Sequence, residues 1–347
     1  MEEFSRKKLN KTMESLQLAD CKLQDEDRVY LLNYKNPYFL DYMLEKGAKG
    51  ILDFYIKATM KITAGIPLLM VPGRFACSCF NAKTPDGKRI LARNFDYKDS
   101  PCMVVWCSPE NGYKSVGIAD MLFMSYGFKR TPKDYKDRFW TLVAPYAVMD
   151  GMNEKGLCIS ILEQKGIPAK QSTSRTPIIT TLALRAILDK CATVDEAIAL
   201  LDNYDMHDVL GCNYHYQIID REGGNVIIEY VDNKMVVIRP EEGKDYQYLT
   251  NFLVSAPEGD RKGNFGYSRY FAIRDNIEPK NGIMTEDEAM SLLEHIKLEY
   301  RHHLLKHRVT SLWSVVYNID DLTFDLCAGA DYSKKYTFGI EPATWQK

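Results

Sequence analysis

The sequence predicts an α+β fold in which strands and helices form separate layers. With 347 residues, of which 46% are hydrophobic, the chain can bury a large core. From residue 77 onward, runs of strand character and stretches of helical periodicity follow one another as strands, helices, strands, helix and strands. Such a grouped order is typical of α+β proteins and argues against a repeating β-α-β pattern.

The first 76 residues differ in composition from the rest of the chain. They are rich in charge, and their apolar side chains follow helical spacing within 39–44 and 51–60, with Gly47 and Gly50 expected to break the helix between them. A stretch rich in glycine and proline, 65–73, then leads to Cys77. We therefore expect residues 1–76 to be a helical, separable segment, followed by a catalytic domain over 77–347.

Strand signals dominate after residue 77. Two strands, one from Cys77 and one through Arg93, are expected on either side of the turn Pro85-Asp86-Gly87. Helices are expected over 176–201 and from Thr285 toward residue 300, where Thr285 and Glu288 have the spacing of a capping box. The remaining strands are expected at 103–106, 140–143, 157–162, 215–219, 225–229, 235–238, 314–317 and 323–327.

Charge and cysteine usage favour a cytoplasmic protein. The 45 Lys and Arg residues against 47 Asp and Glu give a net charge of −2, which indicates neither a nucleic-acid partner nor binding to an anionic membrane. The first eight residues lack the apolar core of a signal peptide, and the apolar run 66–71 is too short to span a membrane. Nine cysteines without paired spacing suit a reducing compartment. A homo-oligomer is left open.

Cys77 is the strongest candidate for a catalytic residue. Two strands joined by a turn would bring its thiol to the same sheet end as Arg93 and Asp96. A single cysteine is more often a buried structural thiol, and Cys79, on the same strand face, is a rival. If the Ala76–Cys77 bond were cut, Cys77 would carry a free α-amine beside its own thiol, and one residue would supply both nucleophile and base.

Four motifs follow one another along the chain. They are Cys77-Ser78 with Arg93-Asn94-Phe95-Asp96, the hairpin 150–157, Leu249-Thr250-Asn251, and Ser268-Arg269-Tyr270. Together and in this order they resemble the choloylglycine hydrolase group of N-terminal nucleophile hydrolases, which includes bile salt hydrolases, penicillin V acylases and the acid ceramidase relatives. The resemblance runs from about Cys77 to the C-terminus. It implies a four-layer αββα sandwich, two antiparallel sheets flanked by helices, that hydrolyses linear amide C–N bonds without a metal or cofactor.

The resemblance also implies a role for each matched residue. Cys77 would be the nucleophile, and Arg93 would favour its thiolate. Asp96 would hold the α-amine, and the Asn251 side chain would donate to the oxyanion. Arg269 would steady Asp96 or the substrate. We interpret the hairpin 150–157 as structural, since its turn residues need no catalytic explanation.

Two departures from the family pattern concern Glu163 and the leading segment. Bile salt hydrolases carry an asparagine where this chain has Glu163, so its backbone N–H is the expected second oxyanion donor, and bile-salt-like recognition is disfavoured. The long segment before Cys77 is more similar to acid ceramidase, N-acylethanolamine acid amidase and penicillin acyltransferase, which are cleaved internally. We therefore expect self-cleavage between Ala76 and Cys77.

Three functions remain open from the sequence. An amidase would hydrolyse a small-molecule N-acyl amine or N-acyl amino acid, an acyltransferase would pass the same thioester to an amine, and a silent binder would only hold acyl ligands. Residues 121–128 could form a lid over an acyl chain or a core strand. The basic cluster 301–308, with His303 and His307 one helical turn apart, lacks acidic partners and is interpreted as a solvated helix end, not a metal site.

Overall fold

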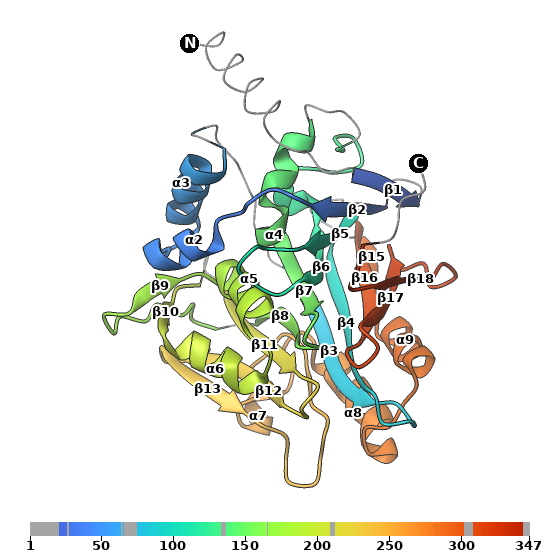
Figure 1. Cartoon of the computed structure of the whole chain (residues 1–347). Coiled ribbons are helices and arrows are strands. Elements are labelled where there is room, and N and C mark those ends of the chain that lie inside the picture. Colours follow the sequence, from blue (N-terminus) through green and yellow to red (C-terminus); the bar gives the residue numbers. More distant parts are fainter. Residues whose placement is uncertain are drawn as a thin grey trace.

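The protein is described by a computed structural model in which two large sheets are flanked by helices (Figure 1). The structure describes residues 21–25, 28–63, 65, 75–132, 137–164, 166–208, 212–301 and 308–342. The predicted α+β class is confirmed. Within these ranges no helix is both long and apolar enough to cross a membrane.

The larger sheet has nine strands in the order β1-β2-β5-β6-β7-β8-β11-β12-β13. Its inner strands are buried along their whole length, as expected of a sheet that is covered on both faces. The strands are β1 (Cys21–Asp25), β2 (Val29–Tyr34), β5 (Cys102–Cys107), β6 (Ser115–Asp120), β7 (Val148–Asn153), β8 (Cys158–Gln164), β11 (Asn213–Ile219), β12 (Asn225–Val231) and β13 (Lys234–Ile238).

The second sheet has seven strands, in the order β14-β3-β4-β16-β17-β18 with β15 paired to β16. The predicted hairpin forms its centre: β3 and β4 run antiparallel, with Cys77 opposite Phe95 and the turn at Gly87, whose φ of 88° suits glycine. The strands are β3 (Ala76–Lys83), β4 (Arg89–Lys98), β14 (Tyr248–Leu249), β15 (Glu299–Arg301), β16 (Arg308–Asn318), β17 (Thr323–Ala328) and β18 (Tyr336–Gly339).

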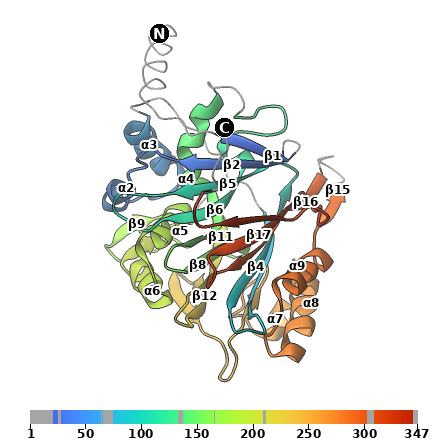
Figure 2. The ribbon, with the colours of Figure 1, turned by 45° about the vertical axis from the view of Figure 1, so that its right-hand side comes forward.

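Helices cover the two sheets from opposite sides (Figures 1 and 2). On the nine-stranded sheet, α5 (Thr180–Lys190) packs against β7 and β8, and α6 (Val194–Asp202) follows it. On the seven-stranded sheet, α8 (Tyr267–Ile277) and α9 (Glu286–His295) pack against β3, β4 and β16. The predicted capping box of α9 is present, formed by Thr285 and Glu288.

The remaining elements are short. They are α2 (Leu40–Lys46), α3 (Ile51–Ile62), α4 (Ala144–Ala147), α7 (Glu258–Arg261), the 3₁₀ turns η1 (Met121–Met124), η2 (Asp137–Val143) and η3 (Glu278–Lys280), and a pair of parallel strands, β9 (Thr176–Ile178) and β10 (Tyr204–Met206). Of these, η1 and η2 lie close to the nine-stranded sheet and contribute buried side chains to its core.

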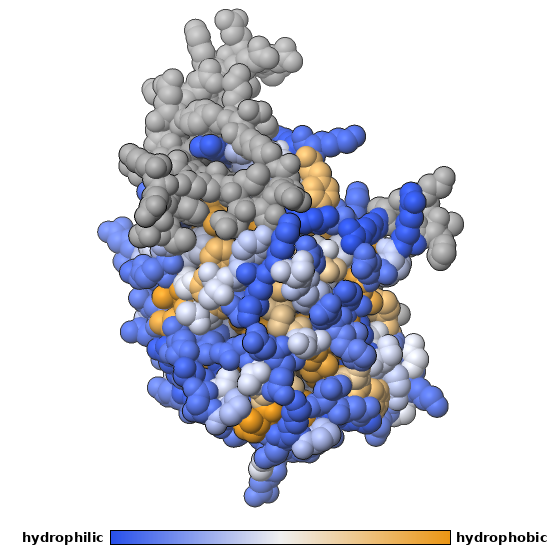
Figure 3. Space-filling model, turned by 90° about the vertical axis from the view of Figure 1, so that its right-hand side faces the viewer, coloured by the Kyte–Doolittle hydropathy of each residue, from blue (hydrophilic) through white to orange (hydrophobic). Residues whose placement is uncertain are grey.

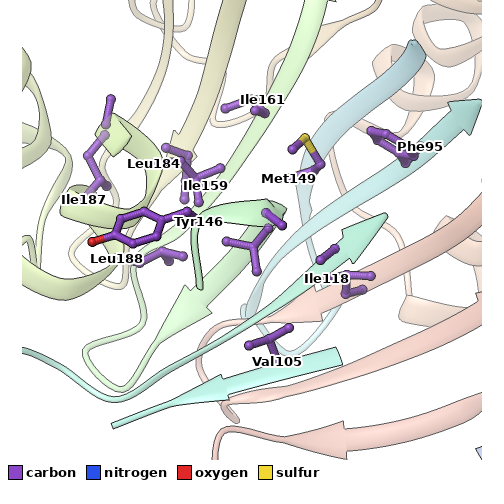
Figure 4. Close-up of a cluster of buried hydrophobic side chains, with 14 of the residues drawn as sticks. Phe95, Val105, Ile118, Tyr146, Met149, Ile159, Ile161, Leu184, Ile187 and Leu188 are labelled. Atoms are coloured by element: carbon purple, nitrogen blue, oxygen red, sulfur yellow. The ribbon is translucent and has the colours of Figure 1, made fainter. Parts of the chain in front are cut away.

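The main core lies between the two sheets and under α5. Apolar side chains from β4, β5, β6, β7, β8 and α5 meet there, with Phe95, Met149 and Ile161 on the side toward β3 and β4 (Figure 4). A second cluster fills the space between the seven-stranded sheet and α8 and α9. The outer face seen in Figure 3 is mostly hydrophilic, with small apolar patches. Burial on this scale fixes both hairpin strands around Cys77.

Residues 1–76 are helical only in part. The helices expected within 39–44 and 51–60, and the break at Gly47 and Gly50, are confirmed by α2 and α3, whereas helix is wrong for 29–34. That the segment is separable stays a prediction. Val29–Tyr34 forms β2, which runs parallel to β5, so the nine-stranded sheet is not wholly antiparallel either. The Tyr34 hydroxyl donates to the Leu142 carbonyl, and the Tyr38 hydroxyl donates to Asp189. Apolar β-prone residues over 29–34 bury more surface in the sheet than a short isolated helix could.

Two other expectations need correction. Trp140–Val143, expected as a strand, lies in η2, where Phe139, Leu142 and Val143 are buried on one side. The helix expected over 176–201 is instead β9 followed by two helices, because Cys191 and the N-cap Thr193 interrupt it. Met121–Met124 is a 3₁₀ turn, with three of its four side chains buried. Its lid role therefore stays a prediction, and the core-strand alternative is wrong.

Candidate active site

Cys77 lies at the start of β3, where the chain enters the space between the sheets. Its side chain is fully buried, and the Arg93 guanidinium donates from Nη2 to Sγ at 3.1 Å. The hairpin register explains this contact, because Arg93 is opposite Cys79 and therefore close to Cys77 on the same face of the ladder. The structure thus brings the predicted nucleophile and its predicted cation together.

The acidic partner of Arg93 is Asp150. From the sequence, Asp150 was expected to be only part of a structural hairpin. Arg93 Nη1 lies 2.6 Å from Asp150 Oδ2, and both side chains are fully buried. The Trp313 indole N–H and the Tyr317 hydroxyl also donate to this carboxylate, at 2.9 and 2.5 Å. Burial raises the pKa of Asp150, while Arg93 and these donors favour its charged form. A strand-borne carboxylate in the hairpin motif was the missed signal.

Backbone carbonyls complete the cage around Arg93. Its Nη1 donates to the Met149 carbonyl at 2.5 Å and its Nη2 to the Ile161 carbonyl at 2.6 Å. The guanidinium also stands over the ring of Phe95, which is itself stacked on Trp313. With these contacts the guanidinium has a single orientation, and one edge of it faces the thiol.

Asp96 and Arg269 form a second buried ion pair beside the first. Arg269 Nη1, on α8, lies 2.7 Å from Asp96 Oδ2, and the Ser311 hydroxyl donates to Asp96 Oδ1 at 2.5 Å. Burial raises the pKa of Asp96, and the Arg269 charge and the Ser311 hydrogen bond oppose that rise. Ser311 was not foreseen, because it comes from β16, 215 residues farther along the chain.

Asn251 connects this second pair to the nucleophile. Its side-chain oxygen accepts from Arg269 Nη2 at 2.7 Å and from the Cys77 backbone N–H at 3.1 Å. The residue before it is anchored by His215, whose Nε2 lies 2.8 Å from the Thr250 carbonyl, while His215 Nδ1 lies 3.0 Å from Glu229. In the uncut chain Asn251, and not Asp96, therefore holds the nitrogen that would become the α-amine. The Asp96 role stays a prediction for the cut chain.

Glu163 lies in the same site, at the end of β8. Its carbonyl accepts from the Asn251 side-chain N–H at 2.6 Å, and its carboxylate accepts from the Phe75 backbone N–H at 2.8 Å. The expected contribution of the Glu163 backbone N–H to an oxyanion hole stays a prediction. In the uncut chain the Asn251 side-chain N–H is already hydrogen-bonded to the Glu163 carbonyl, so it is not available to an oxyanion.

Burial decides the protonation state of the thiol in the uncut chain. It raises the pKa of Cys77 to about 11, although the Arg93 charge and hydrogen bond act in the opposite direction. Arg93 thus acts in the expected direction, toward the thiolate, but burial outweighs it in the uncut chain. Cys79 is equally buried, and burial raises its pKa to about 12. Both thiols are therefore protonated at neutral pH in the uncut chain.

Two further expectations concern metals. Among the side chains that the structure describes, no group of three or more His, Cys, Asp or Glu residues converges as metal ligands would. His303 and His307 lie outside the described residues.

Comparison with known sequences places most of this chain in a family. A family model described as acyl-coenzyme A:6-aminopenicillanic acid acyl-transferase matches residues 82–332, which include Arg93, Asp96, Glu163, Asn251 and Arg269 and begin just after Cys77. Penicillin V acylase of Pectobacterium atrosepticum is 28% identical over 181 residues, a match that covers 47% of this chain and 45% of that acylase. The match thus spans about half the length of that relative.

Two solved structures share the fold at low sequence identity. A mutant of the conjugated bile acid hydrolase from Clostridium perfringens has a TM-score of 0.53 and 16% identity, covering 76% of this chain and 92% of that one. Penicillin V acylase from Agrobacterium tumefaciens has a TM-score of 0.52 and 17% identity, covering 76% and 86%. This chain therefore has the N-terminal nucleophile hydrolase fold and belongs to the acyl-coenzyme A:6-aminopenicillanic acid acyl-transferase family.

Proposed function

We propose that this protein is a cysteine amidase that hydrolyses linear, non-peptide C–N bonds of N-acyl amines or N-acyl amino acids after cutting its own Ala76–Cys77 bond. The observation that carries the proposal is the contact of Arg93 Nη2 with Cys77 Sγ, at a residue whose backbone nitrogen is held by Asn251. A buried cation beside a thiol, with the future α-amine fixed close by, suits this chemistry. The relatives named above for penicillin V and conjugated bile acids support the amide class.

Self-cleavage would use the groups already in place. Cys77 Sγ attacks the Ala76 carbonyl carbon, the C–N bond to Cys77 breaks, and the nitrogen takes the thiol proton to become the α-amine. Water then hydrolyses the Ala76 thioester and leaves a carboxylate. Arg93 would stabilise the sulfur anion during attack, and its fixed orientation requires little rearrangement at that moment.

In the cut chain the same groups would serve a substrate amide. An α-amine has an unperturbed pKa of about 7.7–8.0, close to that of a thiol at about 8.5, so it can accept the Cys77 proton at little cost near neutral pH. When the substrate carbonyl displaces the Glu163 carbonyl, the Asn251 N–H becomes available to the developing oxyanion. Water finally releases the acid from the thioester.

Acyl transfer is the second candidate, because the matching family is described as an acyl-transferase. It needs the same thioester, with an amine in place of water as the final acceptor. Product analysis with and without an added amine, by mass spectrometry, separates the two reactions. A product that appears only with the amine, and carries it, would establish transfer.

Mass spectrometry of the purified protein tests the amidase proposal directly. We expect a chain that begins at Cys77, and turnover of at least one substrate in a panel of bile conjugates, phenoxyacetyl amides and long-chain N-acyl amino acids. Cys77→Ala should remain uncut and inactive, whereas Cys79→Ala, a matched change of a buried thiol on the same strand, should still be cut. A Cys77→Ala chain that splits at the same bond would exclude self-cleavage by this thiol.

A further inference from the structure

The residue two positions before Cys77 occupies an aromatic pocket in the site. The Phe75 side chain is buried, and its ring centroid lies 4.9 Å from that of Phe95, 5.9 Å from Tyr214 and 6.1 Å from Phe123. These distances and tilted orientations fall in the favourable range for aromatic pairs. The uncut chain therefore fills a specific aromatic site with its own phenyl ring.

The backbone of Phe75 is recognised as well as its ring. Its N–H donates to Glu163 Oε2 at 2.8 Å, in a buried hydrogen bond. Besides burial, which is the largest cause, and the neighbouring Cys212, the Glu163 charge helps to raise the pKa of Tyr214. The carboxylate thus lies close to the aromatic pocket, and in the uncut chain Asn251 links Glu163 to Cys77, because it bonds both the Glu163 carbonyl and the Cys77 N–H.

The direction of the chain places Phe75 on the acyl side of the Ala76–Cys77 bond. If Cys77 attacks the Ala76 carbonyl, then Phe75 and Ala76 are the acyl part of the first amide that the site cleaves. A later substrate is attacked by the same sulfur and uses the same oxyanion donors, so its acyl part must lie on the same side. Phe75 and Ala76 therefore represent the acyl group that the pocket fits.

We propose that the site selects an aromatic acyl group with an N–H donor at the position of the Phe75 nitrogen. The Glu163 carboxylate would accept the hydrogen bond from this donor. The matching substrate class is amides of an aromatic aminoacyl group joined through one small residue to the scissile carbonyl. This inference rests on the proposed amidase function and specifies its substrate.

A carboxylate at this position gives a strong preference. An ammonium or amide N–H at this position donates a charge-assisted hydrogen bond to the Glu163 carboxylate, as the Phe75 N–H does, whereas an acyl group without a donor forfeits that bond. Sites built to hydrogen-bond a substrate group discriminate strongly against analogues that lack it. The phenyl ring alone would not produce this effect, because both kinds of acyl group fill the aromatic pocket.

Three fluorogenic substrates with the same leaving amine test the proposal. They are the aminomethylcoumarin amides of phenylalanyl-alanine, of N-acetylphenylalanyl-alanine and of phenylpropanoyl-alanine, which keeps the ring and lacks the N–H. For the self-cleaved wild-type protein we expect kcat/KM to be about 10- to 100-fold higher for the first two than for the third, as for the loss of one hydrogen bond to a charged group.

Glu163→Gln keeps the shape of the side chain and removes its charge. We expect this substitution to lower the phenylalanyl-to-phenylpropanoyl ratio of kcat/KM to within about 3-fold. The matched control is Glu154→Gln, in the turn that follows β7, which accepts from the Lys114 backbone and should leave the ratio at its wild-type value.

The outcomes separate this inference from the proposed function. Equal kcat/KM for the three substrates, or a ratio that Glu163→Gln does not change, would overturn the Glu163 role while leaving the amidase proposal intact. A protein that neither frees Cys77 nor turns over any amide contradicts the proposed function itself. Should Glu163→Gln fail to fold, the wild-type ratio between substrates with and without the N–H still decides.

Discussion

Two buried arginine–aspartate pairs support Cys77, and they differ in what surrounds them. Arg93 and Asp150 have no exposed side-chain surface and lie between the sheets, where two backbone carbonyls bond to Arg93 and two aromatic donors bond to Asp150. Arg269, on α8, keeps 8% of its side-chain surface exposed, whereas its partner Asp96, on β4, is fully buried. The inner pair contacts the sulfur, and the outer pair contacts Asn251.

The site needs a cation fixed beside the thiol and an oriented Asn251 amide, and a different ion pair provides each of them. The inner pair fixes a cation against the nucleophile and cannot move without opening the core. The outer pair orients an amide through a residue that reaches in from a surface helix. We therefore expect changes to the inner pair to affect folding most, and changes to the outer pair to affect the reaction more than the fold. The following stability tests use the Cys77→Ala background, so that self-cleavage does not differ between variants.

Arg93→Met should have the largest effect on stability. It leaves Asp150 as an uncompensated buried charge and removes the donors to the Met149 and Ile161 carbonyls, and breaking a buried pair in this way typically costs about 3–5 kcal/mol. Urea unfolding at pH 7 measures this free energy. A loss below about 1 kcal/mol would show that water reaches the pair and that the inner site is not sealed.

Arg269→Met should cost less, about 2 kcal/mol, because Asp96, although fully buried, keeps its Ser311 hydrogen bond and loses a partner that is itself 8% exposed. In the Cys77 protein the same change should lower the rate of amide turnover about 10²- to 10³-fold, since Asn251 loses the donor that orients it. Arg274→Met is the matched control on the same helix. Its exposed pair with Asp275 should make no measurable contribution to the free energy of unfolding.

Asp120 sharpens the comparison, because it is a fully buried aspartate that bonds to Ser100 and the Leu122 N–H without an arginine. Burial raises its pKa to about 7. The folded state then keeps a proton that the unfolded state loses above about pH 4, so this stabilisation is complete below that pH and is lost as pH rises through about 7. As pH rises from 5 to 8, the free energy of unfolding of Asp120→Asn should therefore increase by about 1–2 kcal/mol relative to that of its parent, as measured by urea unfolding.

A difference between Asp120→Asn and its parent that does not change with pH would mean that Asp120 is charged in the fold. In that case burial without a cation would not suffice to keep a carboxyl neutral here. Asp120 would then no longer show that Asp150 and Asp96 need their arginines to offset the cost of burying a charge.

The smallest effect is expected from the double variant Arg93→Met with Asp150→Leu. Replacing both partners removes the unpaired charge, which should recover about 1 kcal/mol relative to Arg93→Met alone. Recovery stays incomplete because the Trp313 N–H and the Tyr317 hydroxyl lose their acceptor. A double variant no more stable than Arg93→Met would show that these two donors, and not the ion pair, dominate the energetics.

Local sequence was sufficient for one part of the site. The turn at Gly87 and the alternating residues around it predict the hairpin that places Arg93 beside Cys77, because both residues lie within one pair of neighbouring strands. The capping box of α9 was equally local. The motif order also identified Asn251 and Arg269, which the structure brings to Asp96 and Cys77.

Other features depend on contacts that local patterns do not encode. Asp150 was interpreted as part of a turn because the glycine and asparagine that follow it explain a hairpin, and only the approach of β4 reveals its arginine. Ser311 comes from a strand whose bulge beside Trp313 sets its direction. The register of β2 against β5 likewise arises from burial and not from propensity.

The parallel pairing of β2 with β5 bears on what a cut at Ala76 would produce. The strand β2, Tyr34 at its end and Tyr38 after it are held to the rest of the protein by hydrogen bonds that do not involve the scissile bond. The product would then be a two-subunit protein encoded by one gene, whose small and large subunits co-elute in native size-exclusion chromatography and separate only on a denaturing gel. The leading segment would behave as a permanent structural subunit of the mature enzyme.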